Sequence, residues 1–377
     1  MSEYLDKILG SLIGGAAGDA LGYPIEFQSY EQICHQYGPE GMTEYALDRR
    51  DVALFSDDTQ MTLFTANGIL VGATRAATRG ISGPVHIYIA RAYQDWLNTQ
   101  SSYFRKGYEM ERCSWLCDVP ELYAARAPGN TCLSALEANR ETGRCEVRLD
   151  QPCNHSKGCG GIMRVAPLAL YKFRKSLEKL TEEGALCAAI THGHPLGYMP
   201  AGVLVDIVHQ LVYNGTQLRR AISNALEVAK RVFRGEKELP VMAALVRRAM
   251  ELAENRESDI DNIRALGEGW VAEETLAIAV YCALRHEDDF SAALVAAVTH
   301  DGDSDSTGAV TGNILGALHG YGALDEKWKE HLELREVIEE MGRDLDQGCP
   351  LDDWDYDSDP DWERKYIRMH WKAENES

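Results

Sequence analysis

Two short acidic runs hold the side chains best suited to chemistry. Residues 55–61 read F-S-D-D-T-Q-M and residues 299–309 read T-H-D-G-D-S-D-S-T-G-A, so carboxylates stand at adjacent or alternate positions. One carboxylate at the start of a helix is explained by capping of the free N–H groups. Two adjacent or three alternating carboxylates exceed that need. Taken singly, each run is compatible with capping or with metal binding.

The second run shares only its aspartate spacing with the calcium loop of an EF-hand. Such a loop has glycine at its sixth position and a bidentate glutamate at its twelfth. Counted from Asp301, these positions hold Ser306 and Gly312. The run is therefore not an EF-hand.

We hypothesise that the two runs meet in the folded protein. Two carboxylates about 5 Å apart repel each other by roughly 3 kcal/mol at an effective dielectric constant near 20. Repulsion between several such pairs would offset much of the free energy of unfolding of a domain, which is about 5–15 kcal/mol. The cluster would bind protons or cations, and oxygen ligands from Asp and Ser select Mg²⁺, Mn²⁺ or Ca²⁺. A binuclear site would place its ions roughly 3.5–4 Å apart.

Composition restricts the other functions that the chain could have. Its 377 residues are 45% hydrophobic and 26% charged, with a formal net charge of −21. This balance argues against binding of nucleic acid or of anionic membranes, since both need clustered cations. We expect no secretory signal, because acidic residues precede the short apolar run at the start, and no membrane-spanning segment.

The ten cysteines are scattered along the chain, which predicts reduced thiols and a cytoplasmic protein rather than a disulfide scaffold. The tightest group is Cys153, His155 and Cys159. Its spacing is poor for zinc and it offers three ligands at most. We therefore expect ordinary thiols here.

Helical periodicity recurs along nearly the whole chain and predicts an all-α globule with irregular connections. One short alternating segment, 145–149 (C-E-V-R-L), is the best candidate for a strand. The connection at 99–130 is long, which is often a sign of function. The expected helices cover residues 5–21, 59–77, 84–97, 131–140, 165–179, 183–191, 200–213, 217–233, 240–254, 271–285, 290–299 and 306–319.

Two of these helices carry a glycine at every fourth position. Each interior glycine costs roughly 0.5–1 kcal/mol relative to alanine, so the stripes need a compensating contact. A smooth ridge at this spacing allows the close approach of a second helix. We therefore predict that two central helices pack together through these glycines. They are Gly10, Gly14, Gly18, Gly22, Gly308, Gly312, Gly316 and Gly320.

The end of the chain differs in composition from the rest. After Pro350 the sequence reads L-D-D-W-D-Y-D-S-D-P-D-W-E, with aromatic residues among the acids. We expect a helical domain at 1–349 and an acidic, aromatic extension at 350–377. The favoured interpretation is that the aromatic side chains pack on the domain while the acids remain in water. The alternative is a docking segment for a basic partner.

Six motifs in order give the chain a resemblance to the ADP-ribosylglycohydrolases, which include the dinitrogenase reductase-activating glycohydrolase and hydrolases acting on ADP-ribosylarginine. The resemblance covers most of residues 8–320. It implies a compact, orthogonal multi-helix bundle around a central binuclear metal site. The motifs are G-G-A-A-G-D-A-L-G-Y-P-I-E-F at 14–27, S-D-D-T-Q-M at 56–61, A-P-G-N-T at 127–131, G-C-G-G-I-M-R at 158–164, T-H at 191–192 and G-D-S-D-S at 302–306.

The resemblance implies particular roles for the two acidic runs. Two Mg²⁺ or Mn²⁺ ions would be held by both runs together, and the catalytic candidates are Glu26, Asp57 and Asp58. Threonine is commoner in the family at the two hydroxyl positions, where serine keeps the oxygen. The implied metal ligands are Ser56, Asp57, Asp58, Asp303, Asp305 and Ser306.

The same resemblance implies a substrate site for ADP-ribose. A glycine-rich turn can bind phosphate through backbone N–H groups alone, which suits an acidic protein. The implied substrate-binding residues are Gly129, Asn130, Thr131, Gly158, Cys159, Gly160, Gly161, Met163, His192, Gly302 and Ser304.

One departure from the family leaves the catalytic base open. Some relatives have an aspartate where this chain has Ala127. Either Glu26 or a water held by the ions takes that role, or the leaving group differs, or the activity is weak. The expected partner is an ADP-ribosylated protein, with arginine the favoured linkage.

Two rival functions stay open at this point. One is a two-metal phosphohydrolase that cuts the diphosphate. The other is a binding or immunity protein that recognises ADP-ribosylated targets or blocks a cognate ADP-ribosyltransferase. For target specificity, the segment 99–126 with Arg105, Trp115 and Arg126 is the first place to look.

Overall fold

The computed structural model describes residues 1–105, 111–143, 145–352 and 359–372. Within these ranges the chain forms helices joined by irregular segments and no strand, which confirms the predicted all-α class. Two isolated bridges tie distant segments together, Ala53 with Leu332 and Gly158 with Val271. The second bridge matters because it fixes the predicted glycine-rich turn.

The long helices are α1 (Glu3–Gly22), α3 (Asp57–Arg79), α4 (Val85–Ser101), α8 (Pro195–Tyr213) and α14 (Ser304–His319). Short 3-10 helices punctuate the connections, among them η1 (Tyr23–Ile25), η2 (Trp115–Asp118), η3 (Pro120–Tyr123), η4 (Cys159–Gly161), η5 (Tyr321–Ala323) and η6 (Glu326–Trp328). The remaining helices are α2 (Tyr30–Tyr37), α5 (Asn130–Thr142), α6 (Pro167–Leu170), α7 (Leu177–Ala188), α9 (Leu218–Val232), α10 (Leu239–Leu252), α11 (Asp259–Arg264), α12 (Ala272–Arg285), α13 (Phe290–Val298), α15 (Arg335–Gln347) and α16 (Pro360–Tyr366).

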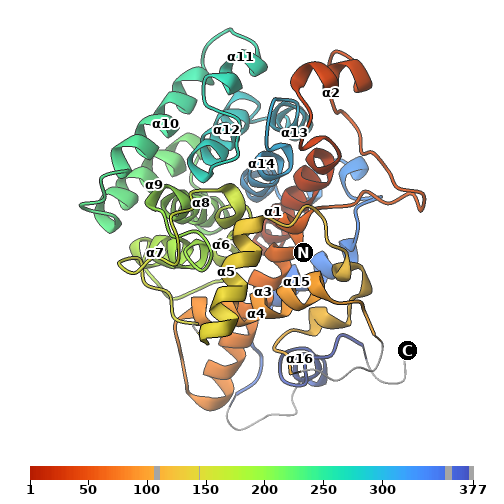
Figure 1. Ribbon diagram of the computed structural model, residues 1–377, viewed down its shortest axis with the longest axis vertical. Coiled ribbons are helices and arrows are strands. Elements are labelled where there is room, and N and C mark those ends of the chain that lie inside the picture. The colour runs from red at the N-terminus through yellow and green to blue at the C-terminus, as the bar shows by residue number, and fades with distance from the viewer. Residues whose placement is uncertain (106–110, 144, 353–358, 373–377) are drawn as a thin grey trace.

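Helices α1 and α14 form the centre of the molecule and pack against each other more extensively than any other pair (Figure 1). A Cβ atom on Gly312 would lie 1.9 Å from the carbonyl oxygen of Gly14, and one on Gly18 would lie 2.0 Å from that of Gly308. Real Cβ atoms never come this close, so the two backbones touch through both glycine stripes. The predicted pairing of the two striped helices is confirmed.

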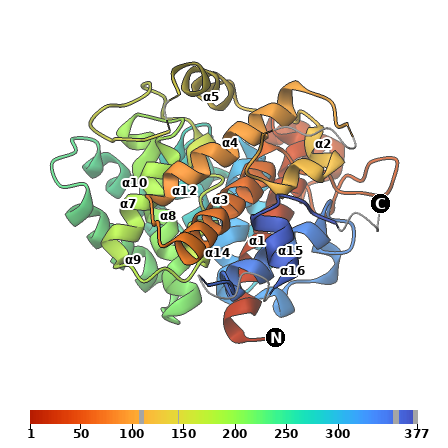
Figure 2. The ribbon, with the colours of Figure 1, turned by 90° about the horizontal axis from the view of Figure 1, so that it is seen from below.

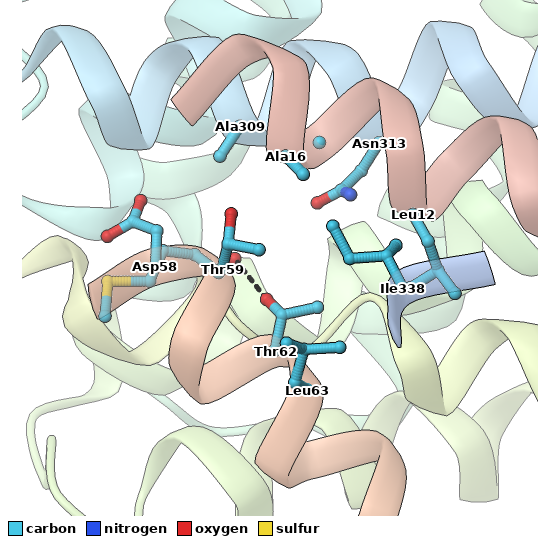
Figure 3. A pocket seen from close by; sticks show the side chains of 11 residues that line it. Leu12, Ala16, Asp58, Thr59, Thr62, Leu63, Ala309, Asn313 and Ile338 are labelled. Carbon is cyan, nitrogen blue, oxygen red and sulfur yellow. Dashed lines mark hydrogen bonds between the residues drawn. The ribbon is translucent and has the colours of Figure 1, made fainter. Parts of the chain in front are cut away.

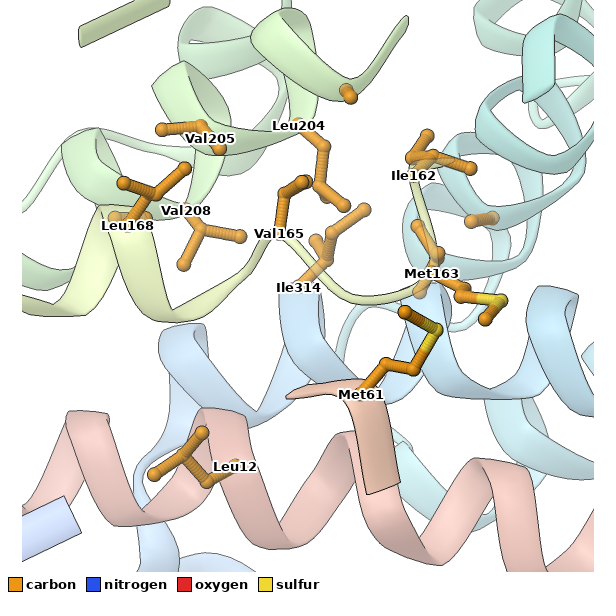
Figure 4. Close-up of a cluster of buried hydrophobic side chains, with 14 of the residues drawn as sticks. Leu12, Met61, Ile162, Met163, Val165, Leu168, Leu204, Val205, Val208 and Ile314 are labelled. Carbon is orange, nitrogen blue, oxygen red and sulfur yellow. The ribbon is translucent and has the colours of Figure 1, made fainter. Parts of the chain in front are cut away.

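The other helices surround this pair. Helix α3 packs beside α4, and α12, α13 and α8 contact α14 on another side (Figures 1 and 2). The core between them is apolar: Figure 4 shows Met61 of α3 and Met163 meeting near Ile314 of α14, with α8 side chains beyond. Each of these side chains is buried. This packing holds the start of α3 near the start of α14, where the two acidic runs lie.

Two expectations about local structure are wrong, and a third is correct except in its bounds. The expected helix at 165–179 ends at Leu170 because Tyr171 adopts an extended conformation, and helix α7 then starts after Ser176, which caps it through Lys179 N–H. The helix expected at 183–191 is the second half of α7, which begins earlier and ends at Ala188. The segment 145–149 forms no strand. Alternation over five residues was too weak a signal without a partner strand.

Several helices were missed by the periodicity analysis: α2, α11, α15 and α16. Helices α2, α11 and α16 are eight residues or shorter, so they carry little periodic signal. Helix α2 has a full capping box between Ser29 and Gln32, a local signal that could have revealed it.

The extension packs on the domain where it is described. Trp362 and Tyr366 of α16 are buried, and the indole N–H of Trp362 donates to Thr74 Oγ1 on α3 at 2.9 Å. Lys365 donates to Asp344 of α15 at 2.6 Å. Residues 353–358, which include the other predicted aromatics, lie outside the described residues.

The structure also tests the expectations about membrane-spanning segments and disulfides. Across the described ranges, no helix combines the length and apolar character that crossing a bilayer needs. No disulfide joins any of the cysteines.

Candidate functional site

The fold brings the starts of two helices and the end of a third to one place. Helix α1 runs along α14, so Glu26, which follows η1, lies beside the first turn of α14. Ser56 is the N-cap of α3 and Asp303 is the N-cap of α14. The two acidic runs, more than 240 residues apart in the chain, therefore meet at two helix N-termini.

Glu26, Asp303 and Asp305 form the tightest acidic group. One carboxylate oxygen from each lies within 4.8 Å of those of the other two, and all three residues are buried. Asp303 Oδ1 and Asp305 Oδ1 both accept a hydrogen bond from Ser306 N–H, at 3.3 and 2.9 Å. One such bond is enough for a cap, so capping alone does not explain the group.

The α3 side of the cluster is arranged by its own cap and by a neighbouring loop. Ser56 Oγ accepts from Asp58 N–H at 3.2 Å, and Asp57 Oδ2 accepts from Gly129 N–H at 3.3 Å. On α14, the side chain of Ser306 favours the ionised form of Asp58, while the charge of Asp303 disfavours it. The two acidic runs are therefore close enough to interact electrostatically.

A further buried acid, Asp19, was missed by the sequence analysis. Its Oδ1 accepts from Ser56 N–H at 2.8 Å, while Oδ2 accepts from the backbone N–H and the hydroxyl of Thr59 at 2.9 and 2.5 Å. Asp19 thus fixes the first turn of α3 against α1. The sequence signal for Asp19 was its position inside the G-D-A-L-G motif, which was interpreted above only as part of a glycine stripe.

Burial and mutual repulsion favour the protonated form of most of these acids. Burial, then the charges of Asp303, Asp57 and Asp19, raises the pKa of Glu26 to about 8. Burial is also the main reason why the pKa of Asp57 rises to about 8. The pKa values of Asp58 and Asp305 are raised well above their usual range, again by burial first and by neighbouring carboxylates second.

The donor atoms fit a hard divalent cation. Within the described part of the chain, Glu26 Oε2 and Asp58 Oδ2 are buried and have no hydrogen-bond partner. Figure 3 shows Asp58 and Thr59 at the start of α3, next to Ala16 and Ala309 of the central helix pair. A buried carboxylate oxygen without a partner is costly. Carboxylate and hydroxyl oxygens are the ligands that Mg²⁺ and Mn²⁺ prefer, so the residues present fit such ions.

The predicted glycine-rich turn borders the acidic cluster. Burial, and next the charge of Asp303, raise the pKa of the Cys159 thiol well above its usual range, so Cys159 is close to the acidic cluster and neutral. Cys159 N–H donates to Trp270 O at 3.2 Å, and a bridge joins Gly158 to Val271, so the turn is held against the segment before α12. This places Gly158–Gly161 beside the predicted metal ligands.

His192 lies behind this turn. A Cβ atom on Gly160 would lie 2.9 Å from both His192 Cε1 and Cys132 Sγ, so only glycine fits there. The imidazole Nδ1 is 2.8 Å from Thr191 Oγ1. Burial, helped by the charge of Arg164, lowers the pKa of His192 to about 3. The ring is therefore neutral at physiological pH.

Met163 lies on the inner side of the cluster. It is 3% exposed, and its sulfur is 4.0 Å from Ser306 Oγ. Its backbone carbonyl accepts a bond of 3.5 Å from Thr62 of α3, drawn in Figure 3. Met163 thus supports the acidic residues from the apolar core.

The loop before α5 contacts the α3 side of the cluster. Asp57 N–H donates to Arg126 O at 3.2 Å, and Gly129 N–H binds the carboxylate of Asp57. Ala127 lies between these contacts and has a φ of 48°, a conformation that aspartate and asparagine tolerate better than alanine. Thr131 Oγ1 lies 3.3 Å from Ser156 Oγ, which ties the start of α5, with Asn130, to the segment before the glycine-rich turn.

Two of the predicted substrate-binding residues shape the turn before α14. Ser304 has no exposed surface and its hydroxyl donates to Gly302 O at 3.4 Å. Gly302 has a φ of 132°, and a Cβ there would lie 2.0 Å from Glu268 O. Its role is also to allow a tight backbone contact.

The specificity segment also needs correction. Trp115 is fully buried, and Arg126 forms a buried ion pair with Glu333 while donating to Phe55 O. Neither side chain can read a target protein. Of the three residues proposed from the sequence, Arg105 alone is exposed.

A pair of exposed aromatic rings stands next to the cluster, and the sequence analysis missed it. Phe27 follows Glu26, and its ring stacks on Trp270 with centroids 5.7 Å apart and planes inclined by 16°. Phe27 is 75% exposed and Trp270 is 37% exposed. Because Trp270 O also binds Cys159 N–H, the aromatic pair connects the acidic cluster with the glycine-rich turn. Contiguous exposed apolar surface, such as two stacked rings provide, often marks an interaction site.

Comparison with known proteins identifies the family to which the chain belongs. The family model of the ADP-ribosylglycohydrolases matches residues 1–354. An ADP-ribosylarginine hydrolase, Tri1, from Serratia proteamaculans is 27% identical over 353 residues, which cover 94% of this chain and 82% of that protein.

Two further likenesses extend over nearly the whole chain. The ADP-ribosyl-[dinitrogen reductase] glycohydrolase of Rhodospirillum rubrum is 24% identical over 90% of this chain and 95% of its own length. A solved structure described as an ADP-ribosylglycohydrolase-related protein complex has a TM-score of 0.63 and 25% identity. The match covers 92% of this chain and 99% of the solved one.

Proposed function

Because this chain belongs to the ADP-ribosylglycohydrolase family and is by that membership a hydrolase of glycosidic bonds, we propose that it releases ADP-ribose from arginine side chains of modified proteins. The bond cut would be the one at C1″ of the distal ribose, and the reaction would depend on two divalent cations. The observation that carries the proposal is the convergence of Glu26, Asp303 and Asp305, with Asp58 close enough to interact electrostatically with Asp303.

The cation ligands are the two acidic runs. Ions bound there would supply Lewis acidity and an anchor for the hydroxyls of the distal ribose. Asp57 is oriented for this role by Gly129 N–H, and the backbone of Asp58 is fixed by its N–H bond to Ser56 Oγ. The proposed ligands are Ser56, Asp57, Asp58, Asp303, Asp305 and Ser306, the residues named from the resemblance.

The protein's own residues would then carry the hydrolytic step. Glu26 has a buried oxygen with no partner in the described part of the chain, beside Asp303 and Asp305. In the proposed reaction, a carboxylate, Glu26 or one of the metal ligands, accepts the proton of the attacking water. The surrounding carboxylates stabilise the positive charge that develops at the anomeric carbon as the bond to the guanidinium breaks.

The glycine-rich turn would hold the diphosphate. Backbone N–H groups in such turns bind phosphate without basic side chains. Gly158 at the start of the turn is partly exposed, whereas Gly160 and Gly161 are buried, and the bond from Cys159 N–H to Trp270 O tethers the turn to the segment before α12. Neutral His192 packs against Gly158 and Gly160 and supports the turn.

Arginine is the linkage that we favour. The support is that Tri1, an ADP-ribosylarginine hydrolase by name, is similar over 94% of this chain. The stacked pair of Phe27 and Trp270 offers a flat, apolar surface beside the acids, and a guanidinium group stacks well on aromatic rings. In the family context, a binding or immunity role aimed at a transferase is not favoured.

The products of the reaction decide between this proposal and the phosphohydrolase rival. Purified protein would be incubated with proteins ADP-ribosylated on arginine or on serine, and the soluble products separated by chromatography. We expect intact ADP-ribose, released faster from arginine. Release of AMP would support cleavage of the diphosphate, and faster release from serine would overturn the assignment of the linkage.

A further inference from the structure

A cavity far from the acidic site is lined by arginines, although the chain has a net charge of −21. Its volume is about 590 Å³, within the range of small-molecule sites. It lies between the C-terminal half of α3, the first turns of α4, residues 111–113 and the segment after α16. The basic residues in its wall are Arg75 and Arg79 of α3, Arg91 of α4 and Arg112.

The arginines outnumber the acids in this wall. The acidic lining residues are Asp95 and Glu111, and one oxygen of Asp95 already accepts from Cys113 N–H at 2.8 Å. Arg112 is partly neutralised by Asp118 at 2.6 Å, and its other nitrogen lies 2.9 Å from His370 Nδ1. The excess positive charge therefore comes from α3 and α4.

Three of the arginines have no partner within the described ranges. No ion pair or hydrogen bond involves the guanidinium groups of Arg75, Arg79 or Arg91 there. The Nε atom of Arg75 is moreover buried without an acceptor. A buried donor left without a partner is destabilising, so an acceptor from outside the chain would be bound favourably.

Helix electrostatics explains only part of this arrangement. Arginine in the last turn of a helix is stabilised by the helix dipole, which accounts for Arg79 near the end of α3. It does not account for Arg91 in the second turn of α4, where a positive charge gains nothing from the dipole, nor for the buried Nε of Arg75.

The rest of the wall is apolar and aromatic. Val71 and Tyr88 face the cavity from α3 and α4, and Ile367 and Met369 face it from the segment after α16. Guanidinium groups bind phosphate oxygens through paired N–H bonds, and an apolar wall suits an uncharged organic group. We propose that this cavity is a binding site for a phosphorylated small molecule about the size of a nucleotide.

This site is distinct from the acidic one. Asp58 and Arg75 lie on the same helix, 17 residues apart, which corresponds to about 25 Å along a continuous α-helix. The charges of the two sites are also opposite. A ligand in the arginine-lined cavity would therefore not occupy the proposed ADP-ribose site, and the inference does not rest on the proposed function.

The test is calorimetric titration of the full chain with ATP and, separately, with inorganic pyrophosphate, in EDTA. The titrations would be repeated on Arg75→Gln/Arg91→Gln and on a control, Arg247→Gln/Arg248→Gln, which removes the same charge from the exposed face of α10. Thermal melting would verify that each variant is folded. Exposed Arg79→Gln alone is the second cavity variant.

We expect saturable binding of ATP to the parent protein, weakened at least about tenfold in the cavity variant and unchanged in the control. If pyrophosphate also binds, the phosphate groups are sufficient for binding. If ATP binds and pyrophosphate does not, the organic group is needed. Both results support the site. Absence of saturable binding, or equal weakening in the α10 control, would overturn it.

Discussion

The carboxylate of Asp19 on α1 accepts hydrogen bonds from both the backbone N–H and the hydroxyl of Thr59, at 2.9 and 2.5 Å. These bonds fix the first turn of α3. Ser56 N–H binds its other oxygen. Because α1 is locked to α14 through the glycine contacts, this single side chain sets where Asp57 and Asp58 stand relative to Asp303 and Asp305.

Replacement of Asp19 by alanine should therefore be severe. It leaves three buried donors without an acceptor, and we expect the free energy of unfolding to fall by about 3 kcal/mol or more. Asp19→Asn, which retains one acceptor oxygen, should lose less. Urea denaturation measures both. The control is Asp6→Ala on the same helix, which removes an exposed contact with Gly322 N–H. Equal losses for Asp6→Ala and Asp19→Ala would contradict the role given to Asp19.

The metal ligands can be tested against a matched aspartate in the same run. Asp58→Asn and Asp305→Asn should each lower turnover at least about 100-fold, since each removes a proposed ligand. Without added metal and near neutral pH, both variants should melt at a higher temperature than the parent, because an amide, unlike a buried carboxyl group with a raised pKa, does not have to take up a proton on folding.

Asp301→Asn is the control for these variants. Asp301 stands at an alternate position of the same run, yet it binds Arg264 Nε at 2.7 Å and Tyr30 N–H at 2.8 Å at the edge of the site. Its loss should change turnover by no more than a few-fold. If Asp301→Asn is as inactive as Asp58→Asn, the division of the run into ligands and structural acids is wrong.

Stability of the metal-free protein should depend on pH in a stated direction. The pKa values of Glu26 and Asp57 are raised to about 8, mainly by burial, whereas unfolded carboxyl groups titrate near about 4. Groups with a raised pKa bind protons more tightly when folded. Their contribution to stability is complete below about pH 4 and is lost as the pH rises through about 8.

The melting temperature in EDTA should accordingly fall between pH 5.5 and 8.5. With Mg²⁺ or Mn²⁺, the stabilisation by the ion should increase over the same range, because protons and cations compete for the same oxygens. Scanning calorimetry with and without metal measures both effects. If the metal-free melting temperature does not change with pH in the parent or in Glu26→Gln, the result would contradict a buried acidic cluster.

The extension after Pro350 should contribute stability. Truncation there removes buried Trp362 and its bond to Thr74, together with the contact between Lys365 and Asp344. We expect Trp362→Ala alone to cost about 3–5 kcal/mol. Trp362→Phe, which keeps most of the apolar contact, should cost less. A truncated protein that melts like the parent would favour a docking role for the extension instead.

Much of the fold could be predicted because its signals are local and redundant. Each glycine stripe indicates a helix that packs closely against another helix. A second stripe of the same spacing is the natural partner, so the pairing of α1 with α14 could be predicted from the spacing of the glycines. Short helices such as α2 and α11 could not be predicted in this way, because six to eight residues carry barely two turns of periodicity.

The site was only partly predictable for a different reason. The acidic runs are dense and stand out against their neighbours, whereas Asp19 is one acid in a helix and its role depends on Thr59, 40 residues away. The stacking of Phe27 on Trp270 joins residues 243 positions apart, and neither segment contains a sequence pattern that predicts this contact. Burial of Arg126 could not be predicted either, because its ion-pair partner Glu333 lies 207 residues further along the chain.

The measurement that tests the central claim most directly is release of ADP-ribose from arginine-ADP-ribosylated protein with Mg²⁺ or Mn²⁺ and, in parallel, with EDTA. We predict release of intact ADP-ribose that is abolished by EDTA, restored by added metal and absent in Asp305→Asn. Equal release in EDTA, or no release by folded protein that holds bound metal, would contradict a metal-dependent glycohydrolase at this site.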